Sequence, residues 1–170
     1  VHKTPWKTRP IVSISGSITH GLGRWLDKEL QPICRKLQSF ISSSFDLKTE
    51  LASLSIDPSR ARFFTVDAVS MYTNIDTNHA LEVISQYLRH SPQCLDIDSE
   101  PIICALEIVM RNNLFKFGDP HWLQITGTET GTPPACLYAI LYYVIHELTL
   151  FPRFQPTVPF YKRYTQAIFA

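Results

Sequence analysis

An aspartate at the end of an apolar segment is the first residue in this sequence that could do chemistry. Asp67 follows the run FFTV, whose aromatic and β-branched residues predict a core strand over residues 62–67. Carboxylate oxygens are the ligands that Mg²⁺ prefers, and one or two of them often suffice when substrate phosphates complete the shell. A carboxylate that merely caps a turn or helix explains the same position, so Asp67 alone leaves both interpretations open.

A loop rich in glycine and threonine is the second candidate. It contains Gly127, Thr128, Gly131 and Thr132 and precedes an apolar helix. Backbone N–H groups at the start of a helix can be directed at a phosphate, although the lysine of a nucleotide triphosphate loop is missing. A structural turn remains the alternative for these residues.

Further candidates lie elsewhere in the sequence, each with an ordinary structural alternative. Arg9 lies with two nearby lysines at the start of the apolar segment 9–14, where it could hold a phosphate or simply be solvated. Tyr72 could stack on a sugar or base, or be a core tyrosine. His146 and Glu147 lack the second histidine, one helical turn away, of a metalloprotease, and we expect them to be structural.

The elements that must position these residues follow from hydrophobic periodicity and turn residues. We expect a helical region over 20–41 that Pro32 kinks or splits, a break at 42–44, a strand at 62–67, helices beginning near Asp76 and Ser99, a hairpin over 114–125, a helix over 135–148, and two strands that meet at Thr165-Gln166. Helices and strands do not alternate regularly in this order, which predicts an α+β fold.

Composition limits the function classes. The chain has 170 residues, about one domain's worth, and 45% of them are apolar, which excludes a disordered tail. The net charge of +1 excludes a generic polyanion binder, but residues 1–62 carry ten Lys and Arg against five Asp and Glu. This basic part can still hold phosphates locally.

Cysteine usage and hydropathy indicate the compartment. Cys34, Cys94, Cys104 and Cys136 lack the spacing of a zinc site. We expect free buried thiols and a location inside the cell, in nucleus or cytoplasm, rather than secretion. The longest apolar run, 135–145, has eleven residues, fewer than the roughly 18 of a membrane span, so we expect no membrane partner.

Four separated segments together resemble a reverse transcriptase domain, most closely that of Penelope-type retroelements. They are RPIVS from residue 9, FTVDAVSMYTNI from residue 64, NNLFKFGD with WLQITGTETGT between residues 112 and 132, and YKRYTQAIF from residue 161. The segments occur in the order of that family, at plausible spacing. The resemblance covers residues 9–170.

The resemblance implies an RNA-directed DNA polymerase of right-hand shape. Residues 1–62 would belong to the fingers and residues 63–170 to the palm, with an antiparallel palm sheet packed on helices. The expected partner is an RNA or DNA template–primer, and the expected cofactor is Mg²⁺. No oligomeric state is implied.

The resemblance also assigns roles to the candidate residues. Arg9 would contact the triphosphate of the incoming nucleotide, Asp67 would bind the catalytic metal ions, and Tyr72 would lie under the sugar. The loop that holds Gly127, Thr128, Gly131 and Thr132 would touch the template and the nascent base pair.

The last motif departs from the family, which has Tyr-x-Asp-Asp in a hairpin turn. The two aspartate positions are occupied here by Gln166 and Ala167. Glutamine offers a neutral carbonyl oxygen and alanine offers no ligand, so Asp67 alone remains of three carboxylates. We therefore expect an inactive reverse transcriptase domain; a non-catalytic nucleic-acid-binding module and a retroelement relic without function are the alternatives.

The ends of the sequence suggest a piece of a longer reading frame. It begins with Val1 rather than methionine and ends at Ala170, just past the last motif. We expect the thumb to be absent.

Overall fold

The computed structural model describes residues 17–55, 57, 59–116, 118–128, 131–154 and 157–170. In this part of the chain the elements are α1 (His20–Arg35), α2 (Ser44–Ser53), β1 (Thr65–Asp67), α3 (Thr77–His90), η1 (Pro92–Cys94), α4 (Ser99–Arg111), β2 (Leu114–Lys116), β3 (His121–Leu123), α5 (Ala135–Leu150), η2 (Phe151–Arg153), β4 (Lys162–Tyr164) and β5 (Ala167–Phe169). The α+β class is confirmed. The segment 9–14 and Arg9 lie outside the described residues.

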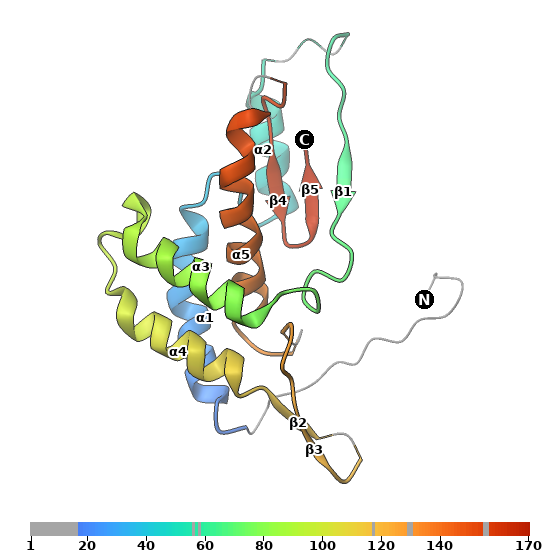
Figure 1. The fold of residues 1–170 in the computed structure, drawn as a ribbon. Helices are drawn as coiled ribbons and strands as arrows, with labels where there is room; N and C mark the ends of the chain where they lie inside the picture. The colour runs from blue at the N-terminus through green and yellow to red at the C-terminus, as the bar shows by residue number, and fades with distance from the viewer. Residues whose placement is uncertain (1–16, 56, 58, 117, 129–130, 155–156) are drawn as a thin grey trace.

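Four helices form the core. α3 packs against α4, α1 packs against α4 and α5, and α3 also contacts α5. Figure 1 shows α3 and α4 running across α1, with one end of α3 against α5. The fully buried side chains come from all four helices and from the turn before α3; they include Leu26, Leu30, Met71, Ile75, Ile84, Leu88, Leu106, Met110, Tyr138 and Leu141. Residues on both sides of position 62 share this core, and the division into fingers and palm remains a prediction.

Helix α1 is shorter than the helical region expected over 20–41, and Pro32 does not split it. It runs through Pro32 as one helix and ends at Arg35. Proline removes the N–H that would bond to the carbonyl of residue 28, but Pro32 and Lys28 are both exposed, so water can reach that carbonyl. The helix therefore tolerates the proline.

Helix α2 was not predicted from the sequence. None of its residues is buried, so it leaves no apolar period for a pattern to detect. Its start is nevertheless readable, because the Ser43 Oγ accepts a hydrogen bond from the Asp46 N–H at 3.1 Å, which is a helix N-cap. The break predicted at 42–44 corresponds to this cap.

The strands form two antiparallel sheets. β1, β5 and β4 make a three-stranded sheet in that order, and β2 and β3 make a separate hairpin. β1 is shorter than the predicted strand over 62–67, and all three of its residues are exposed. The expectation of a core strand, which came from its apolar composition, was wrong. β1 lies at the edge of the sheet, and this position leaves it uncovered.

Helix α5 is the most apolar element. Its buried residues pack on α1 and α3. By length and composition alone, residues 135–153 would also pass as a membrane span, with a mean hydropathy of 1.4. The core helix of a soluble protein passes the same test, and the inner face of α5 is occupied by core contacts.

The four cysteines are free. Cys34 and Cys94 are buried, whereas Cys136 is half-buried and Cys104 is exposed, so the expectation of uniformly buried thiols is wrong for two of them. Burial raises the pKa of Cys34 to about 12, which keeps that thiol protonated and unreactive.

Candidate functional site

The pairing of β1 with β5 brings two of the predicted site positions together. Asp67 lies opposite Ala167 in the antiparallel register, and the Ala68 N–H donates to the Gln166 carbonyl at 2.9 Å. The hydrogen-bonded pairs between β1 and β5 therefore involve residues 64, 66 and 68 on the β1 side. Asp67 and Ala167 lie between two of these pairs and form a non-hydrogen-bonded pair. Such pairs have the closer side chains, so Asp67 lies beside the two positions of the last motif where the family has aspartates.

The hairpin between β4 and β5 turns tightly. Tyr164 pairs with Ala167, which leaves Thr165 and Gln166 as the two turn residues. Thr165 has φ 52°, the left-handed conformation that one central position of a tight hairpin requires. The turn thus places Gln166 at the end of β5, beside Asp67.

The side chain of Asp67 is exposed to solvent. The described residues give its carboxylate no hydrogen-bond or ion-pair partner, and they contain no cluster of three or more His, Cys, Asp or Glu residues able to hold a metal ion. Gln166 and Ala167 add no negative charge. The residues at this hairpin therefore do not fit the two-magnesium site that the family resemblance implies.

The turn after β1 carries Tyr72. Its side chain is half-buried, and burial first, then the neighbouring Cys136, raise the pKa of its phenol. Helix α5 holds this turn in place, because the Tyr143 hydroxyl donates to the Met71 carbonyl at 3.0 Å. Tyr72 is thus partly a core tyrosine, and its stacking on a sugar or base remains a prediction.

The glycine–threonine loop packs directly on this turn. The Gly127 N–H donates to the Ile75 carbonyl at 2.8 Å, and the Thr128 N–H donates to the Tyr72 carbonyl at 2.9 Å. The loop and the turn that carries Tyr72 are therefore held side by side.

The hydrogen bonds of the loop restrict how it could bind nucleic acid. The first two amides of the motif are occupied inside the chain, so they cannot also bind a phosphate in this conformation. The side chains of Thr128 and Thr132 are buried, at 2% and 3% exposure, whereas Gly131 is exposed. A role for Gly127, Thr128 or Thr132 as a direct donor to nucleic acid remains a prediction that would require the loop to move.

Comparisons with known proteins were made on sequence and on structure. No protein-family model and no curated protein matches the chain. A solved structure of apo telomerase from Candida tropicalis, truncated from its C-terminal domain, superposes with a TM-score of 0.60 at 14% sequence identity. The match covers 92% of this chain and 34% of that chain.

The fold is reverse transcriptase-like. At this identity the likeness shows the fold alone, and nothing in it favours the Penelope type in particular. The chain spans about a third of the length of the telomerase structure.

Within this reverse transcriptase-like fold, the hairpin is anchored by an ion pair that the sequence did not reveal. The side chain of Arg163 is 3% exposed. Its guanidinium donates from Nε to the Glu147 Oε1 at 2.9 Å and from Nη2 to the same oxygen. It also donates to the Thr165 carbonyl at 3.1 Å and lies 5.6 Å from the centre of the Tyr143 ring. The anchor therefore connects the hairpin turn to α5.

The backbone of Arg163 adds a second connection. Its N–H donates to the Ser39 carbonyl at 2.6 Å, and its own carbonyl accepts from the Ile41 N–H at 3.1 Å. The available signal in the sequence was the alternation of inward and outward side chains along the strand YKRY. An arginine on the inward side requires a buried acid. The alternation does not identify that acid, which in the structure is Glu147.

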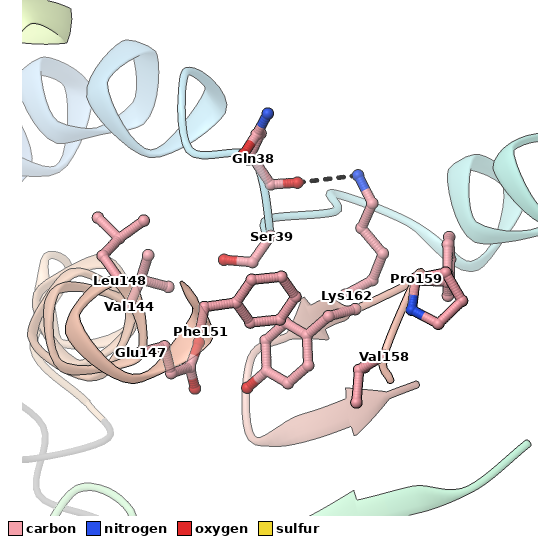
Figure 2. A pocket seen from close by; sticks show the side chains of 11 residues that line it. Gln38, Ser39, Val144, Glu147, Leu148, Phe151, Val158, Pro159 and Lys162 are labelled. Atoms are coloured by element: carbon pink, nitrogen blue, oxygen red, sulfur yellow. Dashed lines mark hydrogen bonds between the residues drawn. The ribbon is translucent and has the colours of Figure 1, made fainter. Parts of the chain in front are cut away.

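A pocket of about 290 Å³ adjoins this anchor on the β4 side, and Figure 2 shows its lining. Lys162 reaches across it to donate to the Gln38 carbonyl at 2.9 Å and pairs with Glu50 at 2.6 Å. Two buried wall oxygens, Ser39 Oγ and Glu147 Oε2, have no partner among the described residues, which suits ordered water. The pocket includes neither Asp67 nor Tyr72.

We predict that Gly127→Ala will destabilise the protein. Gly127 has φ +76°, and an added Cβ would lie 2.8 Å from both the Thr73 Cα and the Tyr72 carbonyl oxygen. Left-handed strain and overpacking each cost about 1–3 kcal/mol, so we expect a loss of about 3 kcal/mol in the free energy of unfolding, measured by urea titration. Gly21→Ala is the matched control, because its Cβ meets nothing within 4 Å. Equal stabilities of the two variants would contradict the observed contact between loop and turn.

Proposed function

We propose that the chain is the fingers and palm part of a reverse transcriptase domain, of Penelope-like type, that no longer polymerises. The observation that carries the proposal is the hairpin register: Asp67 lies opposite Ala167 and next to Gln166. The first metal-binding carboxylate and both expected aspartate positions thus meet at one point, and only one of the three carries a charge.

The proposed loss of polymerisation follows from the missing negative charge at this hairpin. Phosphoryl transfer relies on positioning and on neutralising the charge of the phosphates rather than on covalent chemistry by the protein. A single exposed carboxylate supplies neither the charge nor the spacing that two metal ions require. The half-buried Tyr72 follows this carboxylate closely in the sequence and could still support a sugar. Arg9 would contribute its positive charge to the binding of a triphosphate.

Nucleic-acid binding is the activity that this arrangement retains. Arg60 and Arg62 are exposed and have no ion-pair partner among the described residues. They precede two exposed aromatic residues, Phe63 and Phe64, at 58% and 50% exposure. Cations beside exposed aromatic rings are typical of surfaces that bind single-stranded nucleic acid through phosphate contacts and base stacking. We therefore propose RNA or DNA as the partner and an intracellular location.

A salt titration tests this proposal. Fluorescence anisotropy of a labelled single-stranded RNA should show log K falling linearly with log salt concentration, with a slope of roughly −0.7 for each phosphate contacted. Arg60→Ala with Arg62→Ala should reduce the magnitude of the slope by roughly 1–2. Lys36→Ala is the control, because Lys36 is already paired with Asp96 at 2.8 Å.

The outcome separates the two non-catalytic alternatives. Binding that depends on the two arginines supports a nucleic-acid-binding domain. Binding no stronger than that of an unrelated protein of similar charge would contradict the proposed partner and favour a relic without function.

A further inference from the structure

Two histidines from different core helices meet where α3 packs on α5. The His79 and His146 ring centres lie 5.3 Å apart, with their planes inclined by 32°. Tyr142 stands edge-on to both rings, at 5.8 Å from His79 and 4.6 Å from His146. Three polar aromatic side chains thus converge between α3 and α5, the two helices whose contact can be followed in Figure 1.

The separation of the rings suits a shared metal ion. Metal–nitrogen distances in zinc sites are about 2.1 Å, and two imidazoles that bind one ion at a tetrahedral angle therefore have ring centres about 5 Å apart. The observed 5.3 Å agrees with this value. Two side chains from different helices can chelate an ion only if the fold holds them at this distance.

The hydrogen bonding of the cluster fits the same use. The His79 Nδ1 is within 3.2 Å of the Tyr142 hydroxyl, which orients that ring and leaves its Nε2 for another partner. The His146 Nε2 is buried and has no hydrogen-bond partner among the described residues. A buried polar nitrogen without a partner requires an explanation, and an ion bound between the rings would satisfy it.

We propose that His79 and His146 form a binding site for a divalent transition metal ion of the nitrogen-preferring class, such as Ni²⁺, Cu²⁺ or Zn²⁺. The described residues offer no third His, Cys, Asp or Glu ligand, so water completes the coordination. The site joins α3 to α5, the helix whose Tyr143 holds the turn after β1. This inference does not depend on the proposed reverse transcriptase origin.

Thermal unfolding of the full chain with and without NiCl₂ at pH 7.5 tests the site. An ion that binds the folded state alone raises Tm, so we expect Ni²⁺ to raise the Tm of the wild-type chain by several degrees. His79→Gln and His146→Gln should each weaken the apparent Ni²⁺ affinity tenfold or more. His90→Gln is the matched control, because His90 is also on α3 but bonds to the Gln86 carbonyl at 3.0 Å.

Tyr142→Phe provides a variant that keeps both rings in place. Loss of the hydroxyl that orients His79 should weaken Ni²⁺ binding by roughly tenfold, even if the histidine variants do not fold. No effect of 1 mM Ni²⁺ on the wild-type chain, or equal Ni²⁺ affinities of the wild-type and Tyr142→Phe chains, would overturn the proposal.

Discussion

Replacing Arg163 by alanine will lower the free energy of unfolding by about 3–5 kcal/mol, the usual cost of removing one partner of a buried ion pair. The substitution leaves Glu147, whose side chain is 18% exposed, without its counter-ion. It also removes the donor to the Thr165 carbonyl, which lies in the hairpin turn. Urea unfolding followed by circular dichroism measures the loss.

Two comparisons distinguish this effect from ordinary surface electrostatics. Arg89→Ala removes an exposed ion pair with Glu100 at 2.7 Å and should cost about 0–1 kcal/mol. The double variant Arg163→Met with Glu147→Leu should recover most of the loss, since an apolar pair of similar volume often replaces a buried ion pair at little cost. If Arg163→Ala is no more harmful than Arg89→Ala, the anchor is not a stabilising contact.

Restoring two carboxylates at the hairpin turn should create a metal site. In Gln166→Asp with Ala167→Asp, the new side chain at 167 faces Asp67 across a close, non-hydrogen-bonded pair. We expect Mn²⁺ or Mg²⁺ affinity to rise by roughly tenfold or more, because hard cations bind clustered carboxylates. Isothermal titration calorimetry measures the change.

A neutral variant controls for the change of residue size. Gln166→Asn with Ala167→Asn has side chains of similar volume without charge, and it should bind metal no better than the wild type. Adding Asp67→Asn to the restored variant should remove most of the gain. A restored variant that binds no more tightly than the neutral one would show that Asp67 and the turn do not converge on one ion.

Much of this arrangement could be predicted from local sequence. The cap at Asp76 was readable, since its Oδ1 accepts from the His79 N–H at 2.9 Å, and so was the hairpin around Thr165. The order of the motifs in the resemblance assigned Asp67, Gln166 and Ala167 to one site, and the pairing of β1 with β5 brings them together. In each case neighbouring residues, or a pattern spread along the whole chain, determine the structure.

Other features depend on what lies nearby in space. The ion pair of Arg163 with Glu147 joins strand and helix, and neither residue shows its partner along the chain. Gly127 is required by the approach of Tyr72 and Thr73, which no spacing indicates. The exposure of β1 reflects the absence of a covering element among the described residues, whereas its composition suggested burial.

Primer extension is the measurement that tests the central claim most directly. The purified wild-type chain is incubated with a labelled primer on an RNA template, deoxynucleotides and Mg²⁺ or Mn²⁺. We predict no elongated primer, because one carboxylate remains where polymerase chemistry needs several. Template-dependent product that disappears in Asp67→Ala would contradict the account, since it would show a working polymerase centred on Asp67.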